Sequence, residues 1–380
     1  MRFVAMECAS CAWQVTVCGS GTALIVLSGE VIKVAQAFRA CIHHFELRKG
    51  IPMNDVNRFN PSAALRLRLR PLYKKDNWHW LVALGADLLI IVSAIFLANR
   101  YNALYPLALL FIGSRQRALA SLLHEAAHMT LAQSKALNKW VGEYLLAYPI
   151  FQDYEAYRRS HVQMHHHHLG DKLKDPDHRF YIESGLYEAQ DRLDFLFRHL
   201  FRSVTLVNTY KYFLYLVKNR AGDILANPLQ GLKLLAVHGA MLLLFNYFVG
   251  PWAYVLFWLV PYFTVFQVIG WLSEISEHFG MFGVYKDEVQ LTRNRFPTPV
   301  ERLFIGMHGD NYHLTHHLFA GVPFWNLKQA HQILMEDESY AAANRGCGGI
   351  FTAKGDARSS LHQIFEAYRS GKISTVDVTA

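Results

Sequence analysis

Residues 79–99 have the sequence HWLVALGADLLIIVSAIFLAN, and this stretch decides the fold. Its length matches the roughly 20 apolar residues that a helix needs to cross the hydrocarbon core of a bilayer. A second apolar run follows at 103–123 after a very short link. A second pair of runs lies at 229–249 and 252–272, separated only by a Gly-Pro dipeptide. The sequence therefore predicts an all-α membrane protein with four transmembrane helices in two hairpins.

Two of these runs carry polar residues that a lipid-facing helix avoids. Asp87 lies inside the first run, and we expect it to face the protein interior, because an ionisable group in the bilayer is costly unless it is enclosed. The second run turns polar at Ser114-Arg115-Gln116-Arg117. We therefore expect the lower half of that helix to leave the hydrocarbon.

The distribution of basic residues predicts the topology. Residues 53–78 and 124–228 are rich in arginine and lysine, whereas the two short links hold only Arg100. By the positive-inside rule, both termini and the long middle segment lie in the cytoplasm, as expected for a bacterial inner-membrane protein. The net charge of +8 fits this topology, and no nucleic-acid-binding motif accompanies it, so we expect no nucleic-acid partner.

The ends of the chain differ from the middle. We expect residues 1–52 to form a poorly structured or dispensable extension, with Met53 a possible true start. The membrane domain then covers residues 53–335, and a polar cytoplasmic tail covers 336–380. Four of the five cysteines lie in the first 41 residues, and no C-x-x-C pair recurs, so a structural zinc site is not predicted there.

Three histidine clusters lie outside the predicted spans, all on the predicted cytoplasmic side. They are His124-Glu125-Ala126-Ala127-His128, the run HVQMHHHH at residues 161–168, and His313-Leu314-Thr315-His316-His317. Imidazole is the commonest protein ligand for transition metals. The sequence therefore predicts a cytoplasmic helical cap that holds a histidine-rich metal site.

The number of histidines favours two metal ions. A tetrahedral zinc takes four ligands, which would leave most of these rings unused. An imidazole-rich pair of sites with open positions suits iron that activates dioxygen. Three alternatives remain: a membrane zinc protease using His124-Glu125-x-x-His128 with Glu125 as the base, a soluble-type di-iron bundle, and metal transport or storage.

These clusters and their flanks resemble the integral-membrane fatty acid desaturases and their hydroxylase relatives, over about residues 75–335. The third cluster carries the resemblance best, as Asn311-Tyr312-His313-Leu314-Thr315-His316-His317-Leu318-Phe319. The first, preceded by Arg115-Gln116-Arg117-Ala118-Leu119, is similar to the bacterial branch. The second departs from the usual H-x-x-H-H, because Met164 makes it H-x-x-x-H-H, a spacing that membrane alkane hydroxylases also have.

The resemblance implies a set of metal ligands. A lone histidine before the last box corresponds to His278. The expected ligands are His124, His128, His161, His165, His166, His278, His313, His316 and His317. His168 is a reserve ligand and His308 a second-shell candidate. The nearby acids Glu125, Asp153, Asp175, Asp177 and Glu277 are expected to accept imidazole N–H groups, and Asp175-Pro176-Asp177 is equally well explained as a turn with a helix cap.

The resemblance also implies the reaction. Two iron ions and dioxygen would introduce a C=C bond into an aliphatic chain, and hydroxylation is the alternative within the family. The sequence has no haem or iron–sulfur motif, so a separate ferredoxin, cytochrome or rubredoxin is expected to donate electrons. The substrate would be a fatty acyl lipid of the membrane. Residues 161–177 also resemble rhizobial family members that act on small amino-acid-derived compounds.

Overall fold

The computed structural model describes residues 14–18, 22–27, 30–32, 56–207, 214, 217, 222, 227–370 and 373. The chain divides into two units, one comprising Met1–Gly50 with Val376–Ala380 and the other Ile51–Thr375. Met53 lies outside the described residues. The proposed role of residues 1–52 as a dispensable extension stays a prediction.

The first unit contains three short strands, β1 (Gln14–Cys18), β2 (Thr22–Leu27) and β3 (Glu30–Ile32). They pair antiparallel in the order β1-β2-β3, with Val15 opposite Ile25 and Val26 opposite Val31. β-branched residues favour strands, and Gly-Ser-Gly and Ser-Gly separate the three segments in the sequence. The expected all-α fold is therefore corrected to a mostly helical one.

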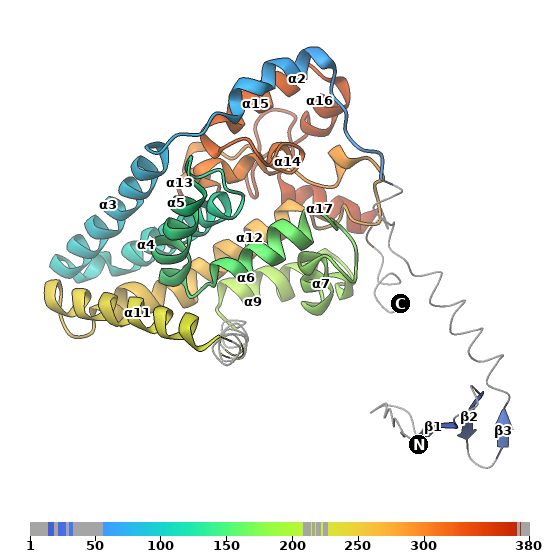
Figure 1. The fold of residues 1–380 in the computed structure, drawn as a ribbon, viewed down its shortest axis with the longest axis horizontal. Coiled ribbons are helices and arrows are strands. Elements are labelled where there is room, and N and C mark those ends of the chain that lie inside the picture. Colours follow the sequence, from blue (N-terminus) through green and yellow to red (C-terminus); the bar gives the residue numbers. More distant parts are fainter. Residues whose placement is uncertain are drawn as a thin grey trace. The chain divides into compact units, whose positions relative to one another are not determined.

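Three helices of the second unit are long and apolar enough to cross a membrane: α3 (His79–Arg100), α11 (Pro228–Phe248) and the continuous helix Val255–Glu277. α4 (Tyr105–Ala127) is of similar length and packs against α3 as the second leg of a hairpin (Figure 1). α4 is not among the three helices apolar enough to cross a membrane, because its second half is polar. This agrees with the expectation drawn from the polar residues Ser114 to Arg117. Three of the four expected spans are thus found by length and composition.

The other helical elements of the second unit are short, and η9, η10 and α12 among them are consecutive parts of the continuous helix Val255–Glu277. They are α2 (Ala63–Leu69), η2 (Arg70–Tyr73), η3 (Asn102–Leu104), α5 (Lys135–Trp140), η4 (Val141–Ala147), η5 (Tyr148–Ile150), α6 (Tyr154–Arg158), η6 (Arg159–His165), α7 (Pro176–Glu183), η7 (Leu186–Glu188), α8 (Arg192–Phe195), η8 (Leu196–Phe201), α9 (Arg202–Val204), η9 (Val255–Leu259), η10 (Tyr262–Phe266), α12 (Gln267–Glu277), η11 (Glu288–Gln290), α13 (Pro299–Phe304), η12 (Met307–Tyr312), α14 (His313–Leu318), η13 (Phe324–Asn326), α15 (Leu327–Leu334), α16 (Glu338–Asn344) and α17 (Ser360–Arg369).

Helix α4 lies at the centre of the apolar core. Ile112, Leu119 and Leu122 are fully buried in it, among residues of α3, η4 and η10. At Gly113 a side chain would not fit, since a Cβ there would lie 2.5 Å from Val265 Cβ. α3 instead turns Leu89, Val92 and Phe96 outward, where a bilayer would cover them.

The intramembrane acid faces the interior, as expected. Asp87 is 1% exposed and accepts a hydrogen bond of 3.2 Å from Arg115 Nη1 on α4. His308 Nε2 lies 2.6 Å from the other carboxylate oxygen. A paired and hydrogen-bonded charge is tolerated at this depth. This contact ties the first hairpin to the segment that precedes the third histidine cluster.

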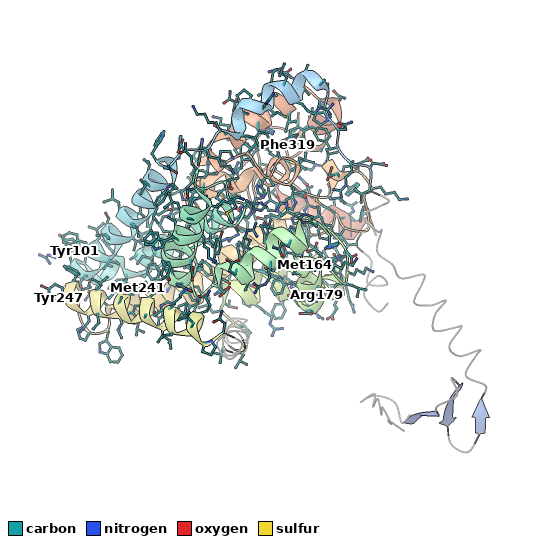
Figure 2. The ribbon with its side chains drawn as sticks, viewed as in Figure 1. Tyr101, Met164, Arg179, Met241, Tyr247 and Phe319 are labelled. Atoms are coloured by element: carbon teal, nitrogen blue, oxygen red, sulfur yellow. The ribbon has the colours of Figure 1, made fainter. Side chains whose placement is uncertain are left out.

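The far ends of α3 and α11 carry exposed tyrosines. Tyr101 and Tyr247 lie at the same end of the molecule in Figure 2, whereas Met164 and Phe319, which adjoin the second and third histidine clusters, lie away from it. Tyrosine is enriched at membrane interfaces. The arrangement is that expected if the hairpin ends and the histidines occupy opposite sides of a bilayer.

Candidate metal centre

The first histidine cluster forms the end of α4. His124 and His128 are four residues apart on one helical face, and His128 is the C-cap residue. Met129 follows with a positive φ of 60°, which turns the chain away from the helix axis. The buried Thr130 hydroxyl then donates a hydrogen bond to the main-chain oxygen of Glu125. The helix therefore ends where its two imidazoles project from it.

The second cluster lies in a π-helical turn, η6 (Arg159–His165). The amide of His166 donates to the carbonyl of His161, five residues earlier, at 3.1 Å. A π-helical turn accommodates one more residue than an α-helical turn. His161 and His166 consequently face the same side, with their Nε2 atoms 3.2 Å apart. The extra residue at Met164 is thus absorbed by the backbone.

The third cluster lies on α14 (His313–Leu318), which a small core positions. Leu314 packs there with Leu69 of α2 and Leu334 of α15. His313 and His317, four residues apart, have Nε2 atoms separated by 3.2 Å. His278 follows α12 directly, and its Nε2 lies 3.0 Å from that of His313. Segments far apart in the sequence thus meet at one place.

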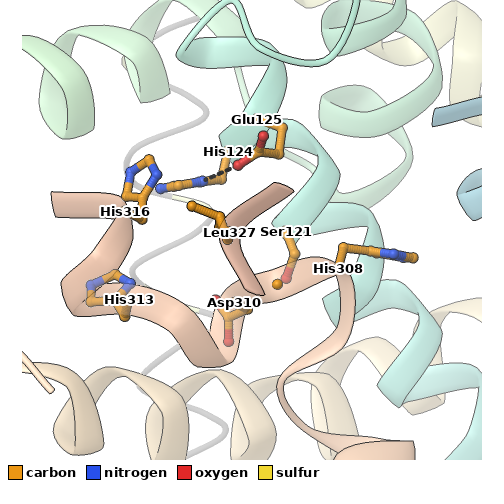
Figure 3. A pocket seen from close by; sticks show the side chains of 9 residues that line it. Ser121, His124, Glu125, His308, Asp310, His313, His316 and Leu327 are labelled. Carbon is orange, nitrogen blue, oxygen red and sulfur yellow. Dashed lines mark ion pairs between the residues drawn. The ribbon is translucent and has the colours of Figure 1, made fainter. Parts of the chain in front are cut away.

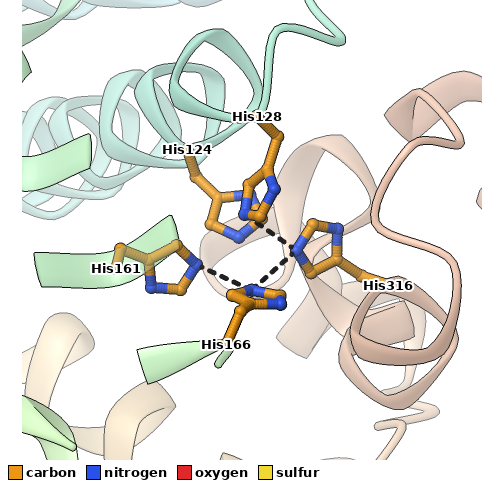
Figure 4. Close-up of side chains that lie close together, drawn as sticks. All are labelled: His124, His128, His161, His166 and His316. Atoms are coloured by element: carbon orange, nitrogen blue, oxygen red, sulfur yellow. Dashed lines mark hydrogen bonds between the residues drawn. The ribbon is translucent and has the colours of Figure 1, made fainter. Parts of the chain in front are cut away.

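Two groups of imidazoles result. The five-histidine cluster comprises His124, His128, His161, His166 and His316 (Figure 4), and the four-histidine cluster comprises His165, His278, His313 and His317. The two are adjacent, since the rings of His166 and His317 stack at a centroid distance of 4.1 Å. All nine histidines expected as ligands are therefore brought together, while their binding of metal stays a prediction.

The spacing of the ring nitrogens fits metal coordination. Within the clusters, six pairs of Nε2 atoms are separated by 3.0 to 3.4 Å. Two nitrogens bound at about 2.1 Å to one ion, at angles between octahedral and tetrahedral, lie about 3.0–3.4 Å apart. His124 Nε2 is also buried without a hydrogen-bond partner among the described residues. A cation between the rings would satisfy these lone pairs.

Electrostatics keep most of these imidazoles neutral. Burial, reinforced by neighbouring histidines, lowers the pKa well below 6.5 for His128, His161, His166, His313, His316 and His317. Burial and the charge of His165 lower the pKa of His278 to about 3. Neutral imidazole is the form that binds metal. Both clusters therefore present lone pairs at neutral pH.

His165 is the exception. Burial lowers its pKa, but the charges of Asp177 and Asp175 outweigh burial and raise it to about 10. His165 Nδ1 lies 2.9 Å from Asp175 Oδ1 and 3.1 Å from Asp177 Oδ2. Such carboxylates fix the tautomer of a ligand and increase its basicity. They leave Nε2 directed at the four-histidine cluster.

Asp175 has both of the roles proposed from the sequence. It is the N-cap of α7, accepting a hydrogen bond from the amide of Asp177 at 3.0 Å, and it orients His165. Its second oxygen accepts from the amide of Gly170 at 2.7 Å. The side chain is completely buried and fully hydrogen-bonded. Asp153 is simply the N-cap of α6.

Glu125 lies behind the first cluster. Its Oε2 accepts hydrogen bonds from the Thr130 hydroxyl at 2.8 Å and from the Phe324 amide at 3.0 Å. Its Oε1 lies 3.6 Å from Nδ1 of His124, the ring nitrogen opposite the cluster. A protease base would instead have to reach water on the metal. Glu125 is therefore placed to orient His124.

Two expected residues lie elsewhere. His168 belongs to neither cluster, and among the run 165–168 only His165 and His166 join them. His308 contacts Asp87 and belongs to neither cluster, although it lines a pocket together with His124, His313 and His316. Its φ of 51° shows why: a left-handed kink at His308 turns the chain before α14.

The structure shows polar groups around His278 and His313; Glu277 was expected from the sequence, whereas Leu291, Thr292, Arg295 and Asp310 were not. His278 Nδ1 lies 3.0 Å from the Leu291 carbonyl and 3.2 Å from the Thr292 hydroxyl. Glu277 Oε2 lies 3.5 Å from His313, and Arg295 bridges Glu277 and Asp310 at 3.0 and 2.6 Å. The only sequence signal for Asp310 was its position three residues before His313.

A small pocket opens on the clusters. Figure 3 shows it between the end of α4 and the segment that leads into α14, with His124, His313 and His316 on one side and Ser121 and Asp310 beside them. A second pocket, lined in part by Arg58, Leu169 and Thr292, reaches His166 and His317. The clusters are thus approached from two directions.

A mostly helical protein with membrane-length helices and adjoining histidine clusters defines a class of membrane-bound, metal-dependent oxidoreductases. A family model described as fatty acid desaturase matches residues 101–346. Dihydrorhizobitoxine desaturase of Bradyrhizobium elkanii is 41% identical over 256 residues, covering 65% of this chain and 72% of the relative. The chain belongs to the fatty acid desaturase family, so the expected family is confirmed. It is a membrane-associated desaturase and therefore an oxidoreductase.

Proposed function

We propose that the chain is a di-iron, dioxygen-dependent desaturase whose site lies on the cytoplasmic side of a bacterial inner membrane, with four spans and both termini cytoplasmic. The observation that carries this proposal is the convergence of nine imidazoles into a group of five and a group of four. Irons held there would supply the oxidising power to break unactivated C–H bonds with dioxygen. The overall reaction removes two hydrogens from adjacent carbons and, with two electrons and two protons, reduces dioxygen to two waters.

The chain's own residues prepare this chemistry. Asp175 and Asp177 orient His165, and the Leu291 carbonyl and Thr292 orient His278. Glu125 makes a longer contact of 3.6 Å with His124. Because these groups fix ring orientation before metal arrives, little reorganisation is needed on binding. The burial of His165, His278 and His313 would limit the access of water to the four-histidine cluster.

The electron donor is proposed to be a separate ferredoxin, cytochrome or rubredoxin. Lys174, Arg179 and Arg192 are exposed on the part of the chain that follows the second cluster. These positive charges would attract an acidic carrier and speed its encounter, especially at low salt. No fused donor motif is present in the sequence.

For the substrate we propose either a fatty acyl lipid or a small amino-acid-derived compound such as dihydrorhizobitoxine. The family description supports the first, and the name of the 41% identical relative supports the second. The proposal is tested by mass spectrometry of lipids and polar metabolites from cells with and without the gene. A product lighter by two hydrogens supports it. A product gaining one oxygen indicates hydroxylation, and peptide cleavage by a zinc-loaded protein lost on Glu125→Gln would contradict it.

A further inference from the structure

Three polar side chains lie shortly before expected metal ligands, on the same helical segment as the ligand or on the segment directly before it. Arg117 lies seven residues before His124 on α4, Tyr157 four before His161, and Glu274 four before His278. Spacings of four and seven place side chains on one helical face. We call Arg117, Tyr157 and Glu274 the inner polar group.

The inner polar group lies together beneath the clusters. α4 packs on both α6 and α12, which carry or adjoin these residues. Arg117 lies within electrostatic range of Asp310, Glu277, the Tyr157 hydroxyl and Glu274. The ring of Tyr157 stacks nearly parallel to that of His161, with centroids 5.4 Å apart. At 1.5 Å per residue, Arg117 lies about 10 Å and Glu274 about 6 Å from the ligands along their helices.

Two polar atoms of this group, one from an arginine and one from a glutamate, lack hydrogen-bond partners within the part of the chain that the structure describes. Arg117 Nε and Glu274 Oε1 are both buried with no hydrogen-bond partner among the described residues. The neighbouring acids cannot serve Arg117 fully, because Glu277 and Asp310 are each paired with Arg295, at 3.0 and 2.6 Å. A buried polar atom without a partner is costly, so this unpaired nitrogen and oxygen are suited to contact a polar ligand.

The identity of these groups points to the ligand. A guanidinium binds a carboxylate, and a carboxylate binds an ammonium group. Asp177 adds negative potential near Glu274. An acyl chain in the same place would bury hydrocarbon against both charges and satisfy neither.

Resting on the proposed desaturase function, we propose that Arg117 and Glu274 select a small zwitterionic amino acid as substrate, with its carboxylate on Arg117 and its ammonium on Glu274. The substrate's aliphatic arm then extends toward the clusters over a distance of about 6–10 Å, which a chain of about four to eight atoms covers. The pocket of Figure 3 adjoins this path, since Ser121 follows Arg117 by one helical turn.

Binding calorimetry on the iron-loaded full chain in detergent tests the proposal with three probes of similar chain length. 2-Aminoheptanoate carries both charges, heptanoate lacks the ammonium and hexylamine lacks the carboxylate. We expect wild type to bind 2-aminoheptanoate about 10- to 100-fold more tightly than either single-charge probe, the range for losing a hydrogen bond to a charged group. Glu274→Gln removes the preference over heptanoate, and Arg117→Gln removes the preference over hexylamine.

The controls separate selection from structure. Arg159→Gln and Glu155→Gln change an exposed arginine and a partly exposed glutamate paired with Lys139, and keep the wild-type preferences. Iron content is expected to remain unchanged in all four variants. Equal binding of 2-aminoheptanoate and heptanoate by wild type, or equal weakening of all probes in Arg117→Gln, overturns the inference. An iron-loaded protein that desaturates only acyl lipid overturns it while the di-iron proposal stands. A zwitterion-selective protein without iron or desaturation leaves the inference standing and overturns the di-iron proposal.

Discussion

The two histidine clusters differ in the polar groups that contact the ring nitrogens facing away from the cluster. In the four-histidine cluster, His165 is backed by two carboxylates and His278 by a carbonyl and a hydroxyl, and His165, His278 and His313 are buried. In the five-histidine cluster, His124 has only a distant contact with Glu125, and Nδ1 of His316 has no partner among the described residues. The four-histidine cluster is thus held by neighbouring polar groups, whereas the five-histidine cluster is predicted to depend more on a bound ion for its order.

The largest effect is expected at His316, the ring that lies within 3.3 Å of both His128 and His166. His316→Ala removes the centre of the five-histidine cluster, so we expect iron content to fall to one ion per chain or less and activity to fall by more than about 1,000-fold. Metal analysis and product mass spectrometry measure both. His167→Ala is the matched control, because this ring is exposed, belongs to neither cluster and has its Nδ1 2.9 Å from the Val162 carbonyl oxygen. Activity retained in His316→Ala would break the comparison.

Asp175→Asn tests the four-histidine cluster, in which Asp175 contacts His165. Asparagine still caps α7, so helix stability is kept, but the charge behind His165 is lost. Iron affinity should fall about 10- to 100-fold, the usual result of removing such a partner. Competition with a chelator measures this affinity. Asp191→Asn, which changes the N-cap of α8 away from both clusters, should leave affinity unchanged; an equal loss there would show that the effect is structural.

A pH experiment tests burial outside the clusters. Burial lowers the pKa of His331 to about 4, and its Nδ1 lies 2.8 Å from the Tyr340 hydroxyl behind α14. Between pH 6.5 and 4 the unfolded chain binds a proton here that the native chain does not, so stability falls as pH drops through this window. His331→Gln should lose less stability than wild type between pH 7.5 and 5, measured by chemical unfolding. Identical pH slopes would contradict the assignment.

The smallest effect is expected at His168, which lies in neither cluster. His168→Ala should change iron content and turnover by less than about twofold, whereas His166→Ala should lose both. Metal analysis and product mass spectrometry of both variants compare two residues of the same histidine run. A strong defect in His168→Ala with a mild one in His166→Ala would show that the register of η6 is wrong.

Much of this molecule followed from local sequence patterns. Apolar runs located α3 and α11 within a residue at each end, because hydrocarbon length sets span length. Residue type and spacing were enough to identify the nine histidines that meet. The π-helical turn at 159–165 could not be predicted, since the sequence does not show which carbonyl the His166 amide will choose.

Other features depend on contacts between distant segments. The hydrogen-bond contact of His278 with the Leu291 carbonyl and the ion pair of Arg295 with Asp310 cannot be predicted from a local sequence pattern. The strands β1–β3 are not predicted from the sequence, because their β-branched runs are too short to distinguish them from an unstructured extension. The position of His308 five residues before His313 made it a second-shell candidate, and the sequence could not predict the left-handed kink that brings it against Asp87.

The measurement that tests the central claim most directly is the metal content of the purified full chain, paired with spectroscopy that detects coupling between two irons. The account predicts two irons per chain, close enough to couple, as the stacked His166 and His317 rings require. It predicts that His278→Ala mainly empties one site while leaving the other occupied. A single zinc per chain, bound equally well after His278→Ala, would contradict the account.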